Sequence, residues 1–170
     1  DLQWIVDAYA LTLSALILSS GVMSDRFGKK QIWNIGVAIF TLGSIICALS
    51  PNNIWLIAGR IIQGIGGAAL IPGAMAIIMM TFSDPQIRNK MVCIWSSSTA
   101  IALIVGPMMG GILVNYFGWA TIFSINIPIG LLIIALSTYA IKPELTNHEI
   151  SLDPIGQLLT MIMLGTLTFG

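Results

Sequence analysis

The feature that most constrains the fold is a series of long apolar runs joined by short polar segments. A bilayer core about 30 Å thick is crossed by about 20 apolar residues in a helix, and each of these runs is long enough. The predicted membrane-spanning helices cover about residues 4–23, 32–50, 54–81, 91–115 and 117–141. We therefore expect an all-α fold, a polytopic bundle of transmembrane helices.

The last part of the chain predicts a linker and one further helix. Residues 142–153 are polar and are predicted to form a cytoplasmic linker, whereas residues 154–170 are again apolar. Asp153 is a good N-cap and Pro154 suits the first helical position, so a transmembrane helix begins there and is truncated at Gly170. Because both ends of the sequence look cut, we expect a piece of a longer protein.

Composition argues against several classes of function. Only 8% of the residues are charged, where soluble domains have about 25%, and 56% are hydrophobic. The formal net charge is zero, so a nucleic-acid partner is not expected. No span carries a catalytic pair or a set of metal ligands, which predicts no enzyme, no metal site and no cofactor. Cys47 and Cys93 are expected to be ordinary buried thiols, and His148 a solvated loop residue.

The basic residues predict the orientation in the membrane. All but one of the Lys and Arg residues follow the first, third or fifth run: Arg26, Lys29, Lys30, Arg88, Lys90 and Lys142. The alternate joints carry none. Under the positive-inside rule, the first, third and fifth spans end in the cytoplasm.

Arg60 is the exception, because it lies about two turns inside the third span. An Arg in the membrane interior costs roughly 2.5–3.5 kcal/mol on insertion scales. Helical spacing places it on one face with an amide and small residues: Gln63, Gly64, Gly67, Ala68 and Ile71. This face should look into the bundle or a watery cavity and serve transport. The alternative is that Arg60 extends to the membrane surface or pairs only with a backbone carbonyl.

Asp7 lies one turn inside the outer end of the first span. It is a candidate protonatable carboxylate and a candidate partner of Arg60, since both lie toward the outer face. A solvated carboxylate at the membrane surface explains the same position.

The joint between the first two spans carries a cluster of charged and turn-forming residues. It contains Gly21, Asp25, Arg26, Gly28, Lys29 and Lys30. An acid at the C-terminal end of a helix opposes the helix dipole and needs a cationic or helix-N-terminal partner. A solvated loop that only sets orientation is the alternative, but it leaves the glycines and the acid unexplained.

The fourth span contains a stripe of small residues with a proline. Gly106 and Gly110 lie on one face, with Pro107 and Gly111 beside them. Small residues four apart permit close helix crossing, and a proline inside a helix removes a backbone hydrogen bond. The pattern predicts a kinked, closely packed helix, used either in alternating access or for packing alone.

Taken together, three motifs resemble those of the major facilitator superfamily of secondary transporters. The segment 21–30 is similar to the signature between that family's second and third helices, with Met23 and Ser24 where Leu and Ala are commoner. The segment 60–68 looks like the fourth-helix signature. The segment 106–111 resembles the fifth-helix antiporter signature, with Ala102 at its upstream glycine position.

Further segments resemble the fourteen-helix branch of drug:proton antiporters, namely 2–9, 123–130 and 152–159. This resemblance implies that the chain holds helices two to six of the N-terminal bundle and the start of helix seven. It also implies export of amphipathic, often cationic, compounds in exchange for protons by alternating access, driven by the proton gradient without a cofactor. Residues Arg60, Gln63 and Asp7 would serve proton coupling, and the 21–30 cluster would latch a cytoplasmic gate. Gly64, Gly67 and the 106–111 segment would serve helix packing and antiport.

The partners implied by the resemblance are a small-molecule substrate, protons, membrane lipid and the C-terminal half of the parent chain. We expect a multi-pass protein of a plasma membrane, and of the bacterial inner membrane in particular. Two alternatives stay open: a transporter of a metabolite, sugar or siderophore, and a membrane scaffold that transports nothing.

Overall fold

The computed structural model describes residues 2–141 and, beyond them, residues 156, 159, 162, 163 and 166. Its elements are α1 (Leu2–Phe27), α2 (Lys29–Ala48), α3 (Asn53–Thr81), α4 (Pro85–Phe117), α5 (Thr121–Ser124) and α6 (Asn126–Ala140). The predicted linker 142–153, with His148 and Asp153, lies outside the described residues. So does most of the predicted helix 154–170, whose few described positions are helical.

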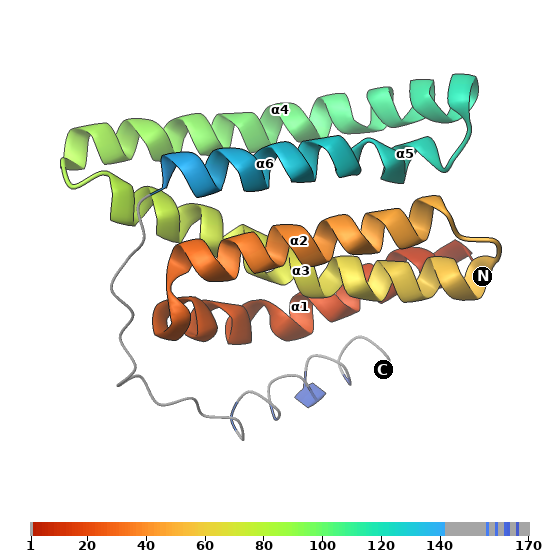
Figure 1. The fold of residues 1–170 in the computed structure, drawn as a ribbon, viewed down its shortest axis with the longest axis horizontal. Coiled ribbons are helices and arrows are strands. Elements are labelled where there is room, and N and C mark those ends of the chain that lie inside the picture. The colour runs from red at the N-terminus through yellow and green to blue at the C-terminus, as the bar shows by residue number, and fades with distance from the viewer. Residues whose placement is uncertain (1, 142–155, 157–158, 160–161, 164–165, 167–170) are drawn as a thin grey trace.

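The described part of the chain is a bundle of helices that run back and forth, which confirms the predicted all-α class (Figure 1). By length and composition, 5 helices could cross a membrane, with α5 and α6 counted together as one. The α1–α2 joint, the α3–α4 joint and the end of α6 lie at one end of the bundle, as Figure 1 shows. The joints with basic residues therefore share one end, as alternating spans require.

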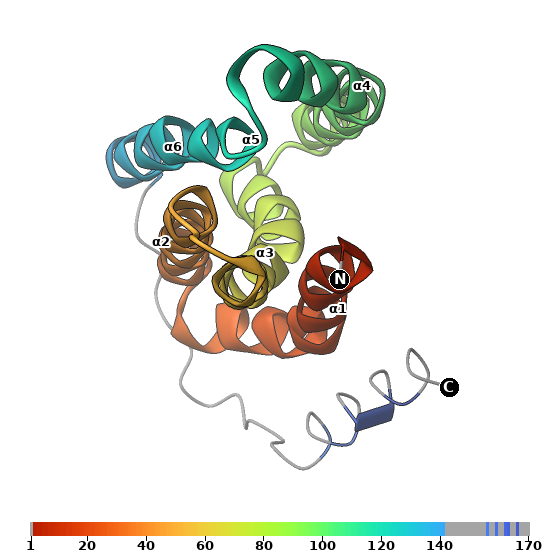
Figure 2. The same cartoon turned by 90° about the vertical axis from the view of Figure 1, so that its right-hand side faces the viewer.

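The centre of the bundle is α3, which packs against α1 on one side and α2 on the other (Figure 2). A Cβ added to Gly43 of α2 would lie 2.7 Å from the backbone nitrogen of Gln63 and 2.9 Å from the carbonyl oxygen of Gly59, both on α3. The two backbones are in contact, and a larger residue has no room there. Small residues thus provide close helix packing in an environment where apolar burial alone gives little.

The joint between α1 and α2 is shorter than the sequence predicted. The helix α1 continues through Asp25 and Arg26 to Phe27, and Gly28 alone separates it from α2. Gly28 has a φ of 97°, which side chains with a Cβ rarely adopt, and its amide donates to the carbonyl oxygen of Ser24 at 3.0 Å. Glycine at this position is what makes so sharp a reversal possible.

The helix α4 begins before its apolar run, at Pro85 rather than near Met91. The side chain of Asp84 accepts from the backbone amide of Gln86 at 2.8 Å, and proline at the first position suits a helix start. The first turns of α4, which carry Arg88 and Lys90, are therefore helical and polar. Hydropathy marks the apolar core of a helix and misses such capped ends.

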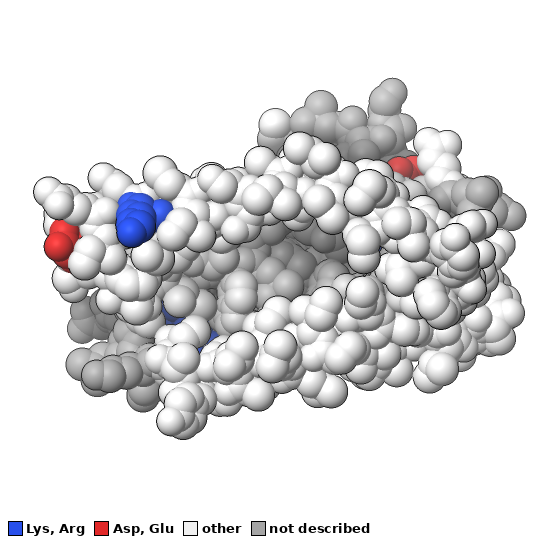
Figure 3. Space-filling model, turned by 90° about the horizontal axis from the view of Figure 1, so that it is seen from above, with Lys and Arg blue, Asp and Glu red and all other residues white. Residues whose placement is uncertain are grey.

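The helix α4 differs from α1, α2 and α3 in burial, since none of its residues is buried. Among the described elements it contacts only α3 and α5, and it lies at the margin of the bundle in the end-on view of Figure 2. Figure 3 views the molecule from the α4 side, where the surface is almost entirely uncharged, is hollowed in the middle and shows its few charged side chains toward the ends. Much of α4 is thus an apolar surface without a protein partner in the described chain.

Candidate functional site

Arg60 makes the contacts that define the candidate site. Its Nε donates to the carbonyl oxygen of Ile5 at 3.0 Å, and its Nη1 donates to Oε1 of Gln63 at 3.1 Å. Its Cζ lies 4.3 Å from the centre of the Tyr9 ring and 6.0 Å from the centre of the Phe123 ring. The guanidinium is therefore partly buried among α1, α3 and α5, and it does not point away to the membrane surface.

Gln63 extends this arrangement to α2. Only 1% of its surface is exposed, and its Nε2 donates to Oγ of Ser44 at 2.7 Å. Ser44 is fully buried and its hydroxyl donates to the carbonyl oxygen of Phe40 at 2.9 Å. The thiol of Cys47 lies 3.8 Å from Oε1 of Gln63. A continuous hydrogen-bonded path thus leads from Arg60 through Gln63 to the backbone of α2.

Gly64 and Gly67 form the part of α3 that faces α1. A Cβ on Gly64 would lie 2.7 Å from Cβ of Thr12 and 2.9 Å from the carbonyl oxygen of Tyr9. Both glycines are buried, as are Gln63 and Ala68, so these four residues of the predicted face do look into the bundle. Ile71, which the helical spacing placed on the same face, is 47% exposed and lies outside it.

Asp7 does not pair with Arg60 in this structure. No ion pair or hydrogen bond joins its carboxylate to another residue in the described part of the chain, and the side chain is half-buried. Among the described residues, the groups that contact Arg60 are neutral: the carbonyl oxygen of Ile5, the amide of Gln63 and two aromatic rings. The assignment of Asp7 to proton coupling stays a prediction.

Several residues of the charged cluster at the α1–α2 joint lack polar partners in the described part of the chain. Asp25 is exposed, and no ion pair joins it to another described residue. Arg26 lies with its Cζ 5.4 Å from the centre of the Phe27 ring, while its buried Nε has no hydrogen-bond partner within the described chain. The Oγ of Ser24 is also buried without a partner there. A Cβ added to Gly21 would meet nothing within 4 Å, so no described helix packs closely at this position.

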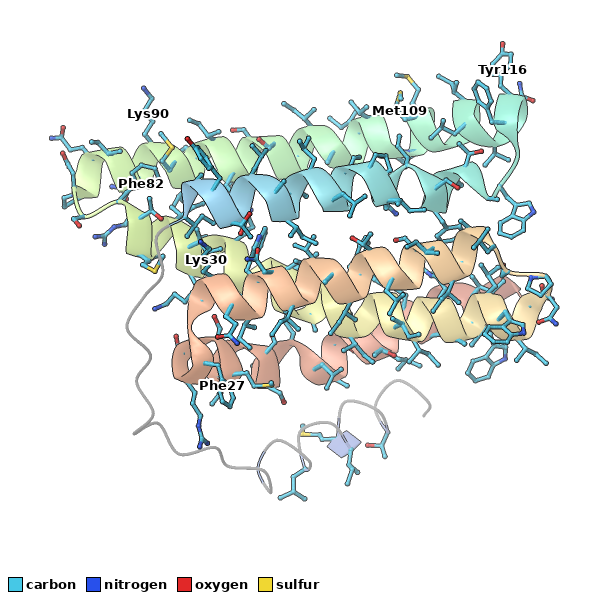
Figure 4. The ribbon with its side chains drawn as sticks, viewed as in Figure 1. Phe27, Lys30, Phe82, Lys90, Met109 and Tyr116 are labelled. Atoms are coloured by element: carbon cyan, nitrogen blue, oxygen red, sulfur yellow. The ribbon has the colours of Figure 1, made fainter. Side chains whose placement is uncertain are left out.

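Lys30 has a role that the sequence did not indicate. Its Nζ donates to the carbonyl oxygen of Thr138 at 3.0 Å and also to that of Ile141, at the C-terminal end of α6. In Figure 4 this side chain lies between the start of α2 and the end of α6. A cation there satisfies free carbonyl groups and complements the negative end of the helix dipole. One turn further along α2, Asn34 accepts a hydrogen bond from Ser137 of α6.

The predicted packing stripe on α4 has no partner in the described chain. Added Cβ atoms on Gly106, Gly110 and Gly111 would meet nothing within 4 Å. The helix runs without a break through Pro107. Figure 4 shows Met109 and Tyr116 pointing away from the other helices. The close helix crossing expected from these residues is therefore not formed with α1, α2, α3 or α6.

A cavity of about 380 Å³ opens at the opposite end of the bundle from Lys30. Ile5 and Phe123, which both contact Arg60, line it together with Trp119 and the α2–α3 joint. The rings of Trp119 and Phe123 meet edge to face with centres 6.4 Å apart. This cavity leads from the surface toward the residues that hold Arg60.

Sequence reasoning missed Tyr9, Ser44 and Phe123. Each comes from a helix other than α3, and the helical period of one segment says nothing about which neighbour faces it. The sequence could have indicated Tyr9 by its depth in the bundle. It lies about two turns from the start of α1, at the same depth as Arg60 in the parallel helix α3.

Within the described residues no group of three or more His, Cys, Asp or Glu side chains is arranged to hold a metal ion.

Comparison with known proteins identifies the relatives of this chain. The family model described as Major Facilitator Superfamily matches residues 1–168. The methylenomycin A resistance protein of Bacillus subtilis is 40% identical over 166 residues, which are 98% of this chain and 35% of that protein. The methyl viologen resistance protein SmvA of Salmonella typhimurium is 36% identical over 163 residues, 96% of this chain and 33% of that protein. The riboflavin transporter RibZ of Clostridioides difficile is 36% identical over 160 residues, 94% of this chain and 35% of that protein.

The family match and the two resistance proteins confirm the predicted resemblance to drug-resistance transporters. All of these matches indicate a transport protein rather than an enzyme. The chain spans about a third of the length of these curated relatives. With its helices long and apolar enough to cross a membrane, it is part of a multi-pass membrane protein.

Proposed function

This chain belongs to the major facilitator superfamily, and on that basis we propose that its parent protein is a proton-coupled exporter of drugs or other amphipathic, often cationic, compounds. The resistance proteins among its relatives support export in general. The proposed mechanism is alternating access, in which two helical bundles move around a site between them. The proposed location is the plasma membrane of a bacterium, with the C-terminal half of the parent chain as the second bundle.

The observation that carries the proposal is Arg60, a cation in the apolar part of the bundle with only neutral partners among the described residues. Neutral acceptors hold a cation less strongly than a carboxylate does, because hydrogen bonds between two charged groups are the stronger ones. Such an arginine can therefore take a carboxylate partner and release it again when that group is protonated. A proton then biases the conformational equilibrium, because the two states differ in their contacts with Arg60.

We assign the carboxylate to Asp7 or to a segment outside this chain. Asp7 is half-buried and without a partner in the described chain, at about the depth of Arg60 in the neighbouring helix. Gln63 would keep Arg60 in place while its carboxylate partner is protonated. The energy for export would come from the proton gradient, and no cofactor would be needed.

The 21–30 cluster and the 106–111 stripe would serve the interface with the second bundle. Asp25 is exposed and α4 has no buried residue, so both are accessible to the C-terminal half of the parent. In this proposal Asp25, Arg26 and Lys29 latch the cytoplasmic gate, and Gly106, Pro107, Gly110 and Gly111 pack closely against the second bundle to limit proton leak.

The test is substrate uptake into inside-out vesicles that contain the full-length parent, with and without collapse of the proton gradient. Radiolabelled methyl viologen and a fluorescent cationic dye serve as probes. We expect gradient-dependent uptake that falls about ten- to a hundredfold in Arg60→Ala, which removes hydrogen bonds from a charged group. Lys90→Ala, which changes an exposed cation in the first turns of α4, is the matched control and should transport normally. Uptake that persists after collapse of the gradient would contradict proton coupling.

A metabolite transporter is the second candidate, because one relative is named a riboflavin transporter. The same vesicles tested with radiolabelled riboflavin separate the two. Riboflavin transport without transport of either cationic probe would replace the drug-export proposal. Correctly inserted protein that moves none of the probes would favour a non-transporting scaffold.

A further inference from the structure

Arg60 is held to α1 at two points that lie one helical turn apart. The carbonyl oxygen of Ile5 accepts from its Nε, and the ring of Tyr9 lies 4.3 Å from its Cζ. Residues four apart in a helix lie on the same face, so Ile5 and Tyr9 present one continuous surface to α3. A carbonyl oxygen has two lone pairs and can accept from Arg60 in addition to its helical partner.

The ring, rather than the hydroxyl group, is the part of Tyr9 that contacts Arg60. A cation within about 6 Å of an aromatic centre is attracted by the negative face of the ring, and the effect is larger where water is excluded. The distance to Tyr9 is well inside this limit, whereas the 6.0 Å to Phe123 is at its edge. No hydrogen bond joins the Tyr9 hydroxyl to a side chain that holds Arg60.

The position of Tyr9 is determined by the glycines of α3. A Cβ on Gly67 would lie 3.3 Å from Oη of Tyr9, and one on Gly64 would lie 2.9 Å from its carbonyl oxygen. The absence of side chains at these two positions lets the tyrosine lie flat along α3. On its other side Arg60 is held by Gln63, which is fixed in turn by Ser44 of α2.

We propose that Tyr9 is a positioning residue for Arg60, whose ring holds the guanidinium against α1 until a movement of α1 along α3 separates them. This inference rests on the proposed role of Arg60 in transport. Because Ile5 and Tyr9 lie on the same helix face, such a movement breaks both contacts together and frees Arg60 for another partner. The orientation of Arg60 is thus linked to the packing of α1 on α3.

The first experiment measures the contact without reference to transport. In the purified full-length parent, thermal unfolding midpoints are compared for wild type, Tyr9→Leu, Arg60→Met and the double variant. We expect Tyr9→Leu to lower the midpoint clearly in the presence of Arg60 and much less in its absence. The same cycle with Phe123→Leu is the matched control, and its coupling should be smaller because that ring is further away. Equal effects of Tyr9→Leu in both backgrounds would overturn the ring contact.

The second experiment tests the positioning role through transport and its pH profile. Gradient-dependent efflux should fall about two- to thirtyfold in Tyr9→Leu, the range expected for loss of a cation–π contact. The pH of half-maximal efflux should move in Tyr9→Leu, and Tyr9→Phe should restore both the rate and the profile. Coupling in the unfolding cycle with wild-type efflux and pH profile in Tyr9→Leu would overturn the positioning role. If the wild type showed no gradient-dependent efflux, the proposed function would fail, while the unfolding cycle would still decide the contact.

Discussion

The bundle of α1, α2 and α3 and the long helix α4 use glycine in opposite ways. In the three-helix bundle, Gly43 and Gly64 bring backbones into contact. The polar residues Gln63 and Ser44 are buried there and hydrogen-bonded to one another. In α4, the glycines at 106, 110 and 111 face open space and no residue is buried. Glycine content alone therefore does not distinguish a helix that completes its own bundle from one whose partner lies elsewhere.

This difference suggests a division of labour. The three-helix bundle holds Arg60 through contacts from α1 and α3. The helix α4 presents a surface suited to a second bundle, which in the proposed function is the C-terminal half of the parent. Substitutions in the full-length parent distinguish these two roles, because those in the three-helix bundle should disturb folding more than those on α4.

The largest effect is expected for Gly43→Leu in the α2–α3 contact. A Cβ there already lies within 3 Å of two backbone atoms that cannot move aside easily, and the rest of the leucine adds to the clash. Overpacking costs about 1–3 kcal/mol or more, so little folded protein should be recovered. The yield of monodisperse protein by fluorescence-detected size-exclusion chromatography checks this. Wild-type yield and unfolding midpoint would show that the two helices are not in backbone contact.

An intermediate effect is expected for Ser44→Ala. This change leaves the buried Nε2 of Gln63 without its acceptor, which costs about 1–3 kcal/mol. The thermal unfolding midpoint should fall accordingly. Ser98→Ala on α4 is the control, because that exposed hydroxyl donates only to the carbonyl oxygen of Ile94 in its own helix. Equal losses for the two variants would argue against a buried polar path from Arg60 to α2.

A smaller effect is expected for Lys30→Ala, which removes the cation at the end of α6. Charge at a helix end contributes about 0.3–1 kcal/mol, so the last turn of α6 should open more often without global unfolding. Hydrogen–deuterium exchange of the peptide that contains residues 136–141 should become faster. Lys90→Ala in the first turns of α4 should leave this peptide unchanged. Exchange at the wild-type rate in Lys30→Ala would contradict the contact.

The smallest effect on folding is expected for Gly110→Leu on α4. Nothing in the described chain lies near this position, so the yield of folded protein should stay at the wild-type level. The free energy of unfolding should change by less than about 0.5 kcal/mol. Efflux should nevertheless fall if this stripe packs against the second bundle. A variant that folds and transports like the wild type would contradict the assignment of α4 to that interface.

Much of the fold could be predicted from the sequence, because long apolar runs and alternating basic joints depend on local composition. The helix ends were harder to predict: residues 24–26 are helical although polar, and α4 starts at its Asp84 and Pro85 cap. Hydropathy does not register such ends, since it averages over windows longer than a cap.

Only part of the candidate site could be predicted from the sequence, for a related reason. Helical spacing grouped Arg60 with Gln63, Gly64 and Gly67, all of which lie on one element. The ring of Tyr9, the acceptor Ser44 and the contact of Lys30 with α6 arise from the rotation of neighbouring helices. That rotation is set by packing between backbones, which no single segment encodes. The proposed pair of Asp7 with Arg60 had the right depth, but Tyr9 takes the contact in this structure.

The most direct test of the central claim is proton movement driven by substrate. The full-length parent is reconstituted in liposomes with a pH-sensitive dye inside, and a gradient of methyl viologen is imposed in place of a proton gradient. Proton-coupled export through Arg60 predicts that protons move in the direction opposite to the substrate, which the dye reports as a change of internal pH. This change should be absent in Arg60→Ala. Substrate flow in the wild type with no accompanying pH change would contradict it.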